Sequence, residues 1–169
     1  MSNSGKIGDL PPRAARAAIP VDQCGMARTV DIVGDRWTLL ILRELFYGVR
    51  RFADFEADLG IPRAVLSQRL GSMVAADLLE KAPYQEQGTR TRYEYHLTPM
   101  AADLMVMVAA MTEWGDRHLR DDLAPLEFFD KDSRKRVHTG FVTASGAAVP
   151  HEQVAARPRK TTTEKNRQD

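Results

Sequence analysis

The sequence lacks the features on which several classes of protein depend. Its 169 residues include a single cysteine, Cys24, so no disulfide can form within one chain and zinc sites built from cysteine pairs are excluded. No stretch approaches the roughly 20 apolar residues that a membrane-spanning helix needs. The start of the chain has no sustained apolar run of the kind found in a secretory signal, so we expect a cytoplasmic protein.

Short motifs for catalysis and metal binding are missing as well. The four histidines are far apart and form no HExxH spacing, so we expect neither a metal nor a cofactor. The sequence contains no nucleophile elbow, no phosphate loop and no cluster of carboxylates beside a base. We therefore expect that the chain is not an enzyme.

Charge is nearly balanced in total but unevenly distributed. A formal net charge of +1 is low for a protein that binds nucleic acid. Residues 99–130, however, carry two basic and seven acidic side chains, whereas residues 131–169 carry nine basic and four acidic ones. Because binding depends on local charge, the composition does not exclude a nucleic acid partner.

Apolar residues recur at helical spacing from residue 24 onward. A short helix is expected over 24–33, with the following glycine as its stop. Asp35 suits the N-cap of a second helix, and Arg50–Gly60 reads as a third. Pro62 favours the start of a fourth helix, where its missing N–H costs nothing.

The fourth helix is predicted to have two unlike faces. The side chains expected to face the core are Val65, Leu66, Leu70, Met73 and Val74. The opposite, mostly polar side carries Arg63, Ala64, Ser67, Gln68 and Ser72. Gly71 inside this helix costs about 1 kcal/mol relative to alanine, so the helix depends on its packing.

Two strand signals follow, over 79–85 and 92–97, and the segment EQGTRT joins them. A long helix is then expected from Thr98 to about residue 120, followed by a charged linker over 121–136. A last hairpin signal lies within 137–149.

This order predicts a mainly α (α+β) fold, a winged helix-turn-helix with a two-stranded wing, flanking helices and a C-terminal β-hairpin. The expected domains are a flexible arm over 1–23, the winged domain over 24–122, and a C-terminal extension over 123–169 that ends in a basic tail.

Several segments of the predicted domain resemble the HxlR-type bacterial transcription regulators. They are CGMARTVDIVGDRWTLLILREL at 24–45, RRFADFEADLGIPRAVLSQRL at 50–70, and RYEYHLTP with TEWGDRHL at 92–99 and 112–119. The resemblance implies a homodimer whose first and last helices pair, so that two recognition helices meet a palindromic operator. Members of that family act as repressors or activators, and several respond to electrophiles or oxidants through a cysteine near the N-terminus, a position that Cys24 matches.

The chain departs from the common pattern of that family at three positions. Asp77 stands where a helix-ending glycine is usual, and Gly71 replaces a larger residue. Ala64 stands where a polar residue often reads DNA, which weakens any assignment of the bases contacted.

A helix of about 10–12 Å diameter fits the major groove, where arginine can bind guanine and glutamine can bind adenine through paired hydrogen bonds. The residues predicted to face DNA from the fourth helix are Arg63, Ala64, Ser67, Gln68, Arg69 and Ser72. Among them, Arg63, Ser67 and Gln68 are expected at base edges. For Arg69 an internal ion pair with Asp54 or Glu56 is an equal alternative.

Two further groups of residues are predicted to contact the DNA backbone. Arg50 and Arg51 stand at the start of the third predicted helix, where free N–H groups favour anions, although two solvated side chains are the alternative. At the wing, the predicted contacts to the backbone or minor groove are Gln87, Thr89, Arg90 and Arg92. A plain exposed hairpin would explain the same wing residues.

The resemblance also implies a dimer interface on the first and last helices, whose apolar residues recur at helical spacing. Its expected members are Met26, Val30, Leu104, Val108, Met111 and Trp114. The two tryptophans and the methionines at 100, 105, 107 and 111 could instead line a pocket for a small-molecule effector, because methionine repacks easily. The periodicity favours core and dimer contacts.

Cys24 supports two interpretations. A lone cysteine usually acts as a small apolar residue. This one precedes a predicted helix start, where the helix dipole raises thiol reactivity, and the resemblance supports a sensor of oxidants or electrophiles. The rival to DNA binding is a winged-helix adaptor that binds protein through the same surfaces, which the low net charge keeps open.

Overall fold

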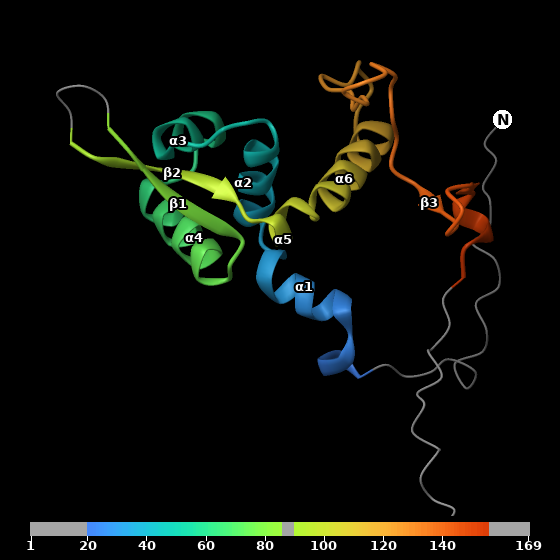
Figure 1. Ribbon diagram of the computed structural model, residues 1–169, viewed down its shortest axis with the longest axis horizontal. Helices are drawn as coiled ribbons and strands as arrows, with labels where there is room; N and C mark the ends of the chain where they lie inside the picture. The colour runs from blue at the N-terminus through green and yellow to red at the C-terminus, as the bar shows by residue number, and fades with distance from the viewer. Residues whose placement is uncertain (1–19, 86–89, 156–169) are drawn as a thin grey trace, which may run out of the picture. The chain divides into compact units, whose positions relative to one another are not determined.

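The computed structural model describes residues 20–85 and 90–155, drawn in colour in Figure 1. They belong to two compact units. The larger unit spans Cys24–Thr139 and contains the helices and the wing. None of the helices in the described ranges is long and apolar enough to span a membrane.

The larger unit is a set of helices with one two-stranded sheet, in the order predicted for a winged helix-turn-helix (Figure 1). Its elements are α1 (Gly25–Val33), α2 (Arg36–Phe46), α3 (Phe52–Leu59), α4 (Arg63–Ala75), β1 (Leu79–Tyr84), β2 (Arg92–Leu97), α5 (Pro99–Ala102) and α6 (Met105–His118). The fold class predicted from the sequence is confirmed.

Local chemistry explains where the helices end. The carboxylate of Asp35 accepts hydrogen bonds from the backbone N–H groups of Trp37 and Thr38 at 3.0 and 3.1 Å, which confirms it as the N-cap of α2. Gly34 is the C-cap of α1, and only glycine fits there because a Cβ would lie 2.4 Å from the carbonyl oxygen of Val30. Gly60 ends α3 with a φ of 58°, a left-handed conformation that favours glycine.

The C-terminus of α4 is closed by a Schellman motif with an aspartate at the left-handed position. Asp77 has a φ of 57°. Its N–H donates to the carbonyl of Val74 at 3.1 Å, and the N–H of Leu78 donates to that of Met73 at 2.9 Å. Leu78 and Met73 are both buried, which is the apolar contact that accompanies this motif.

The wing is antiparallel, with Leu79 opposite Leu97 at its base and Tyr84 opposite Arg92 near its tip. Residues 50 and 51 add a short third pairing to its outer edge. Arg51 bridges Glu94, and the N–H of Tyr95 donates to the carbonyl of Arg50 at 2.8 Å.

One apolar core joins the helices to the base of the wing. Its buried members are Val33, Ile41, Leu42, Leu45, Phe55, Ile61, Leu66, Leu70, Met73, Leu78, Leu79, Tyr95, Ala101 and Val108. The ring of Phe55 meets that of Tyr95 edge to face at 6.5 Å, which ties α3 to β2. Truncating a leucine such as Leu66 in this core would cost about 2–5 kcal/mol.

Two element predictions were wrong in detail. The third helix begins at Phe52, because the backbone of residues 50 and 51 is used for pairing with β2. The long helix expected over 98–120 is divided into α5 and α6. A tight bond from the N–H of Leu104 to the carbonyl of Ala101, 3.0 Å long, replaces the helical pattern there and turns Leu104 toward the core.

The segment after α6, expected as a linker, folds back on itself within the larger unit. Phe129 pairs with Arg136 across a turn in which the carboxylate of Asp130 accepts hydrogen bonds from Ser133. In the smaller unit, Phe141–Val142 (β3) and Ala148–Val149 (β4) pair antiparallel around Gly146, which has a φ of 84°. This confirms the C-terminal hairpin.

Candidate nucleic-acid interface

Helix α4 separates its side chains as the sequence predicts. Leu66, Leu70 and Met73 are buried in the core, and Val65 and Val74 pack against it. The opposite face is open to solvent, and its exposed residues are Arg63, Ala64, Ser67, Gln68, Gly71 and Ser72. Polar groups that can bind base edges therefore lie on the outside of a helix whose other side is fixed.

Arg69 is the exception on this helix, because it points back into the domain. Its Nε lies 3.4 Å from Oδ1 of Asp35, the N-cap of α2, and its side chain is about one third exposed. Burial alone would raise the pKa of Asp35, but hydrogen bonds from Thr38 and Trp37 and the charge of Arg69 hold it below its ordinary value. The pair ties α4 to α2, and the partner is Asp35 rather than Asp54 or Glu56.

Arg63 lies at the first turn of α4 and is held from the side by α3. Its Nη1 donates to Oε2 of Glu56 at 3.1 Å, and its guanidinium lies 5.0 Å from the centre of the Phe52 ring. The side chain is still 75% exposed. Because an exposed ion pair contributes little, Arg63 can leave Glu56 for another acceptor at low cost.

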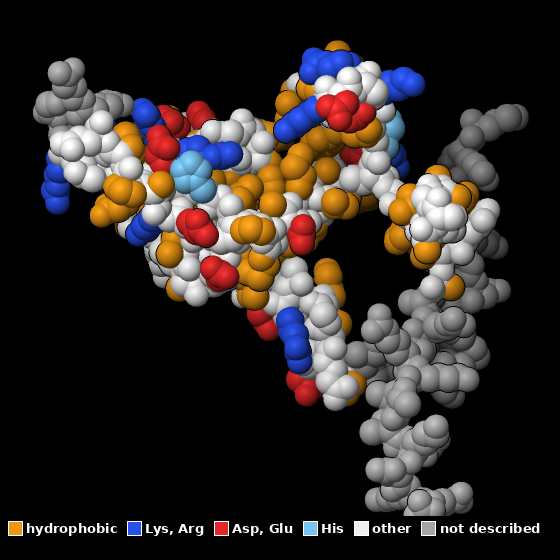
Figure 2. Space-filling view, viewed as in Figure 1, with side chains coloured by type: hydrophobic (Ala, Val, Ile, Leu, Met, Phe, Trp, Pro, Cys, Tyr) orange, Lys and Arg blue, Asp and Glu red, His pale blue; other side chains and the backbone are white. Residues whose placement is uncertain are grey.

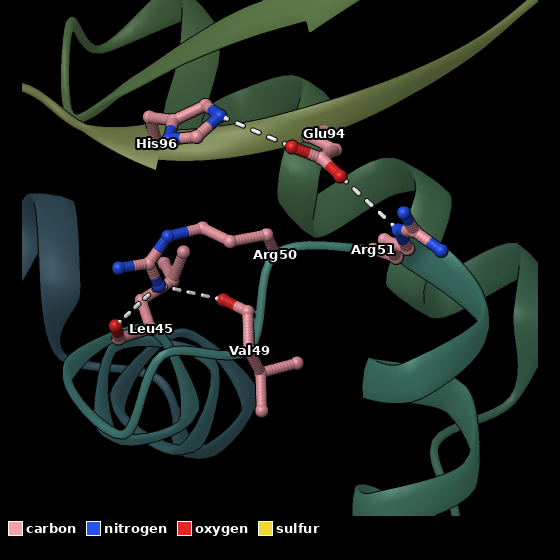
Figure 3. Close-up of polar contacts among 6 residues, drawn as sticks. All are labelled: Leu45, Val49, Arg50, Arg51, Glu94 and His96. Atoms are coloured by element: carbon pink, nitrogen blue, oxygen red, sulfur yellow. Dashed lines mark hydrogen bonds and ion pairs between the residues drawn. The ribbon is translucent and has the colours of Figure 1, made fainter. Parts of the chain in front are cut away.

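Arg50 and Arg51 have partners inside the domain (Figure 3). Nη1 of Arg50 donates to the carbonyls of Leu45 and Val49, at 2.5 and 2.8 Å, at the C-terminal end of α2. The carbonyl of Leu45 also accepts from the N–H of Gly48 at 3.1 Å, and a cation near the C-terminal end of a helix is favoured by the helix dipole. The structure thus shows Arg50 bound to its own chain, and a phosphate contact from it stays a prediction.

Arg51 joins the start of α3 to the wing. Its Nε donates to Oε1 of Glu94 at 3.1 Å, and its guanidinium lies 4.4 Å from the centre of the Tyr84 ring. Glu94 also lies 3.6 Å from Nε2 of His96 on the same strand (Figure 3). These contacts fix the wing against α3.

The wing extends basic side chains into solvent beside α4. Arg92 is the first residue of β2, Arg90 lies two residues before it, and both are exposed. Lys81 lies across from Tyr95, with its Nζ 5.7 Å from the ring centre. The predicted contacts Gln87 and Thr89 lie outside the described residues.

The acidic and aromatic partners of these arginines could not be found from sequence spacing. Glu56 pairs with Arg63, and Glu94 pairs with Arg51. In both pairs the two residues lie on different elements, so the contact depends on how the chain folds between them. Asp35 could be identified as a cap, but its second role needs the packing of α4 on α2.

Part of the predicted dimer interface is exposed on α1 and α6. Met26 on α1 is 72% exposed and Trp114 on α6 is 57% exposed, with Val30 and Met111 about half exposed. Apolar side chains also gather along α6 in Figure 2. Val108 is buried in the core of the chain and Leu104 packs against the same core, so an interface would depend on the other four.

Cys24 occupies the N-cap position of α1. Its backbone is extended, with φ −84° and ψ 116°, and its side chain makes no capping hydrogen bond. The residue as a whole is neither fully buried nor fully exposed.

A helix that packs one face on a helical core, exposes its polar face and is followed by a two-stranded wing defines the winged helix-turn-helix class. Comparison with known proteins is more specific. The chain belongs to the HxlR-like helix-turn-helix family, whose profile matches residues 32–122, just over half of its length. The family resemblance found in the sequence is confirmed.

Relatives and solved structures agree with this assignment. An HTH-type transcriptional regulator of Mycobacterium tuberculosis is 45% identical over 94 residues, which cover 56% of this chain and 58% of that protein. The crystal structure of PA1607, described as a candidate transcription factor, superimposes with a TM-score of 0.68 at 27% identity, over 80% of this chain and 95% of that one. The oxidized form of the redox regulator HypR gives a TM-score of 0.52 at 26% identity, over 59% of this chain and 100% of that one.

Proposed function

We propose that this protein is a cytoplasmic transcriptional regulator that binds a palindromic DNA operator as a homodimer. The observation that carries the proposal is the exposed polar face of α4, which stands beside the wing while the other face fills the core. A helix of this diameter enters the major groove, and the wing then follows the backbone. The family assignment and the names of the relatives support the same function.

Base recognition is assigned to Arg63, Ser67 and Gln68. All three are exposed on one side of α4, and Ala64 beside them can contact a thymine methyl group. Arg63 exchanges its exposed contact with Glu56 for a base or phosphate. Ser72, further along the helix, and Arg90 and Arg92 on the wing contact the backbone.

The homodimer is proposed from apolar surface on two helices that lie outside the helix-turn-helix itself. Met26, Val30, Met111 and Trp114 place large apolar side chains in solvent on α1 and α6. Exposed apolar patches of this kind mark interaction sites. A two-fold dimer would repeat α4 at half-sites about one helical turn apart, or a multiple of it.

DNA binding is tested by fluorescence anisotropy with fragments from upstream of the protein's own gene, at several salt concentrations. Gln68→Ala should relax specificity at one base pair by about 1–3 kcal/mol. Arg92→Ala should weaken binding to all sequences alike and reduce the salt slope by about 1. The reverse pattern would overturn these assignments.

The alternative function is a winged-helix adaptor that binds protein without specific DNA binding. The net charge of +1 favours it. Phosphate contacts make log K fall with log salt at a slope of about −0.9 per contact. A shallow slope, together with no preference among genomic fragments, would support the adaptor.

Cys24 is proposed as the sensor of oxidants or electrophiles. It is the N-cap of α1, one of the two helices assigned to the dimer, and the residue is partly exposed. The similarity to a redox regulator with a solved oxidized form supports the assignment. With one cysteine in the chain, the thiol would bridge to Cys24 of a second copy or take an adduct.

The sensor is tested with Cys24→Ser. Diamide or a quinone should change operator binding by the parent protein and leave the variant unchanged. Non-reducing electrophoresis distinguishes a covalent dimer from an adduct. If the variant releases operator like the parent, Cys24 is not the sensor, while DNA binding itself is unaffected by that result.

A further inference from the structure

A cavity of about 280 Å³ lies between α6 and the segment that follows it. One wall comes from the last turns of α6 and the other from residues 124–138, beyond the end of the family match at residue 122. Its lining residues are Glu113, Asp116, Arg117, Ala124, Leu126, Glu127, Phe128, Arg136, Val137 and His138. The size approaches that of pockets for small organic molecules.

The carboxylate of Glu113 on α6 holds the end of the outer wall. Glu113 accepts hydrogen bonds from the N–H of Thr139 at 3.0 Å and from its hydroxyl at 2.5 Å, and Nδ1 of His138 lies 2.9 Å from the same carboxylate. Burial alone would raise the pKa of Glu113, but these contacts hold it below its ordinary value. Glu113 is therefore ionised, satisfied and unable to serve as the main partner of a ligand.

Two guanidinium groups in the cavity remain available to a ligand. Asp116 lies 3.9 Å from Arg120, whose closer partner, at 2.7 Å, is Asp122. Arg117 and Arg136 line the cavity, and neither guanidinium has a partner among the residues that the structure describes. The lining carboxylates Asp116 and Glu127 balance these two charges, so an anion would be held by the two guanidinium groups themselves rather than by a net positive charge.

The rest of the lining is apolar. Leu126, Phe128 and Val137 come from the outer wall, and Ala124 lies at its start. We propose that this cavity binds a small monocarboxylate with an apolar body, its carboxylate on Arg117 and Arg136 and its body on these side chains. Planar guanidinium groups suit carboxylates because they donate two parallel hydrogen bonds.

A larger neighbouring hollow, about 590 Å³, does not offer the same chemistry. Its cations are already used: Arg43 pairs with Glu44, and Nη2 of Arg120 lies 2.7 Å from Oδ2 of Asp122. The contrast places the anion in the first cavity. This binding claim stands independently of DNA binding.

The test is isothermal titration of the full-length protein with hexanoate, phenylacetate and indole-3-acetate, and with their uncharged amides. We expect at least one acid to bind saturably, with a dissociation constant at or below about 1 mM. Its amide should bind at least roughly tenfold more weakly, since it loses a charge-assisted contact.

Variants locate the site. Arg117→Gln and Arg136→Gln should each weaken binding roughly tenfold. Arg134→Gln is the matched control, because Arg134 lies in the same turn but packs on Phe129 at 4.2 Å and does not line the cavity. Thermal melting shows whether each variant is folded, and Arg136→Lys should restore part of the binding in a folded chain.

Two results would overturn the proposal. One is that none of the three acids binds saturably to the folded parent protein. The other is that Arg134→Gln weakens binding as much as the cavity variants, which would indicate a diffuse charge effect. Operator binding measured on the same variants keeps the proposed regulator role separate from either outcome.

Discussion

Gly71 offers a test of which side of α4 meets DNA. It lies inside the helix, on the exposed face shared with Ser67, Gln68 and Ser72. A Cβ added there would have no heavy atom within 4 Å, so alanine fits without a clash. Alanine is favoured over glycine in a helix by about 1 kcal/mol, and Gly71→Ala should raise the melting temperature by about 4 °C.

The same methyl group should impair operator binding. On a face pressed against a groove, an added methyl forces a shift that costs about 1–3 kcal/mol, or roughly tenfold or more in affinity. Thermal melting and chemical denaturation measure the gain in stability, and fluorescence anisotropy with operator DNA measures the loss of affinity. Gly115→Ala in α6, where a Cβ also has open space, is the control for the gain in helix stability.

Either part of the expectation can fail on its own. No gain in unfolding free energy would contradict the solvent-exposed, helical placement of Gly71. A gain in stability with unchanged operator affinity would show that this face of α4 does not approach DNA, and the assignment of Ser67 and Gln68 to base contacts would then be wrong.

Two further predictions concern the ends of helices. Asp35→Asn keeps a good N-cap but removes the charge paired with Arg69. Because the folded-state pKa of Asp35 is lowered from 3.8, its stabilisation is present above that value and is lost as the pH falls through the folded pKa. Urea unfolding between about pH 2 and 5 should therefore show a flatter stability profile in the variant, and an unchanged profile would contradict the pair. Asp77→Gly should raise the free energy of unfolding by about 0.5–1 kcal/mol, since glycine adopts the left-handed conformation at φ 57° without strain. A loss of stability in the same unfolding measurement would show that the aspartate side chain contributes there.

The helices and the wing could be predicted because their signals are local. The N-cap at Asp35, the proline before α4 and the alternation in β2 depend on neighbours in the chain. The division between α5 and α6 could not be predicted from the sequence. Leu104, which lies at the division, continues the apolar periodicity of a helix, although its N–H bonds to Ala101 in a tight turn and its side chain packs against the core.

The candidate site was predicted in outline but not in its electrostatics. Exposure of Ser67 and Gln68 follows from helical periodicity, whereas the partners of the arginines depend on tertiary packing. Arg50 illustrates the difference. As a sequence feature it resembles a phosphate contact at a helix start, but the backbone there is extended and the side chain reaches the end of α2.

The short pairing of residues 50 and 51 with β2 has a consequence for regulation. This pairing connects the wing to the segment between α2 and α3, so that these elements form one block. The contact between Arg69 and Asp35 adds α4 to that block. Because α4 and the wing, the elements proposed to contact DNA, belong to the same block, their positions relative to each other stay constant. In the proposed dimer, a signal would alter operator affinity by changing the separation between the two blocks, through α1 and α6, while each block itself stays the same.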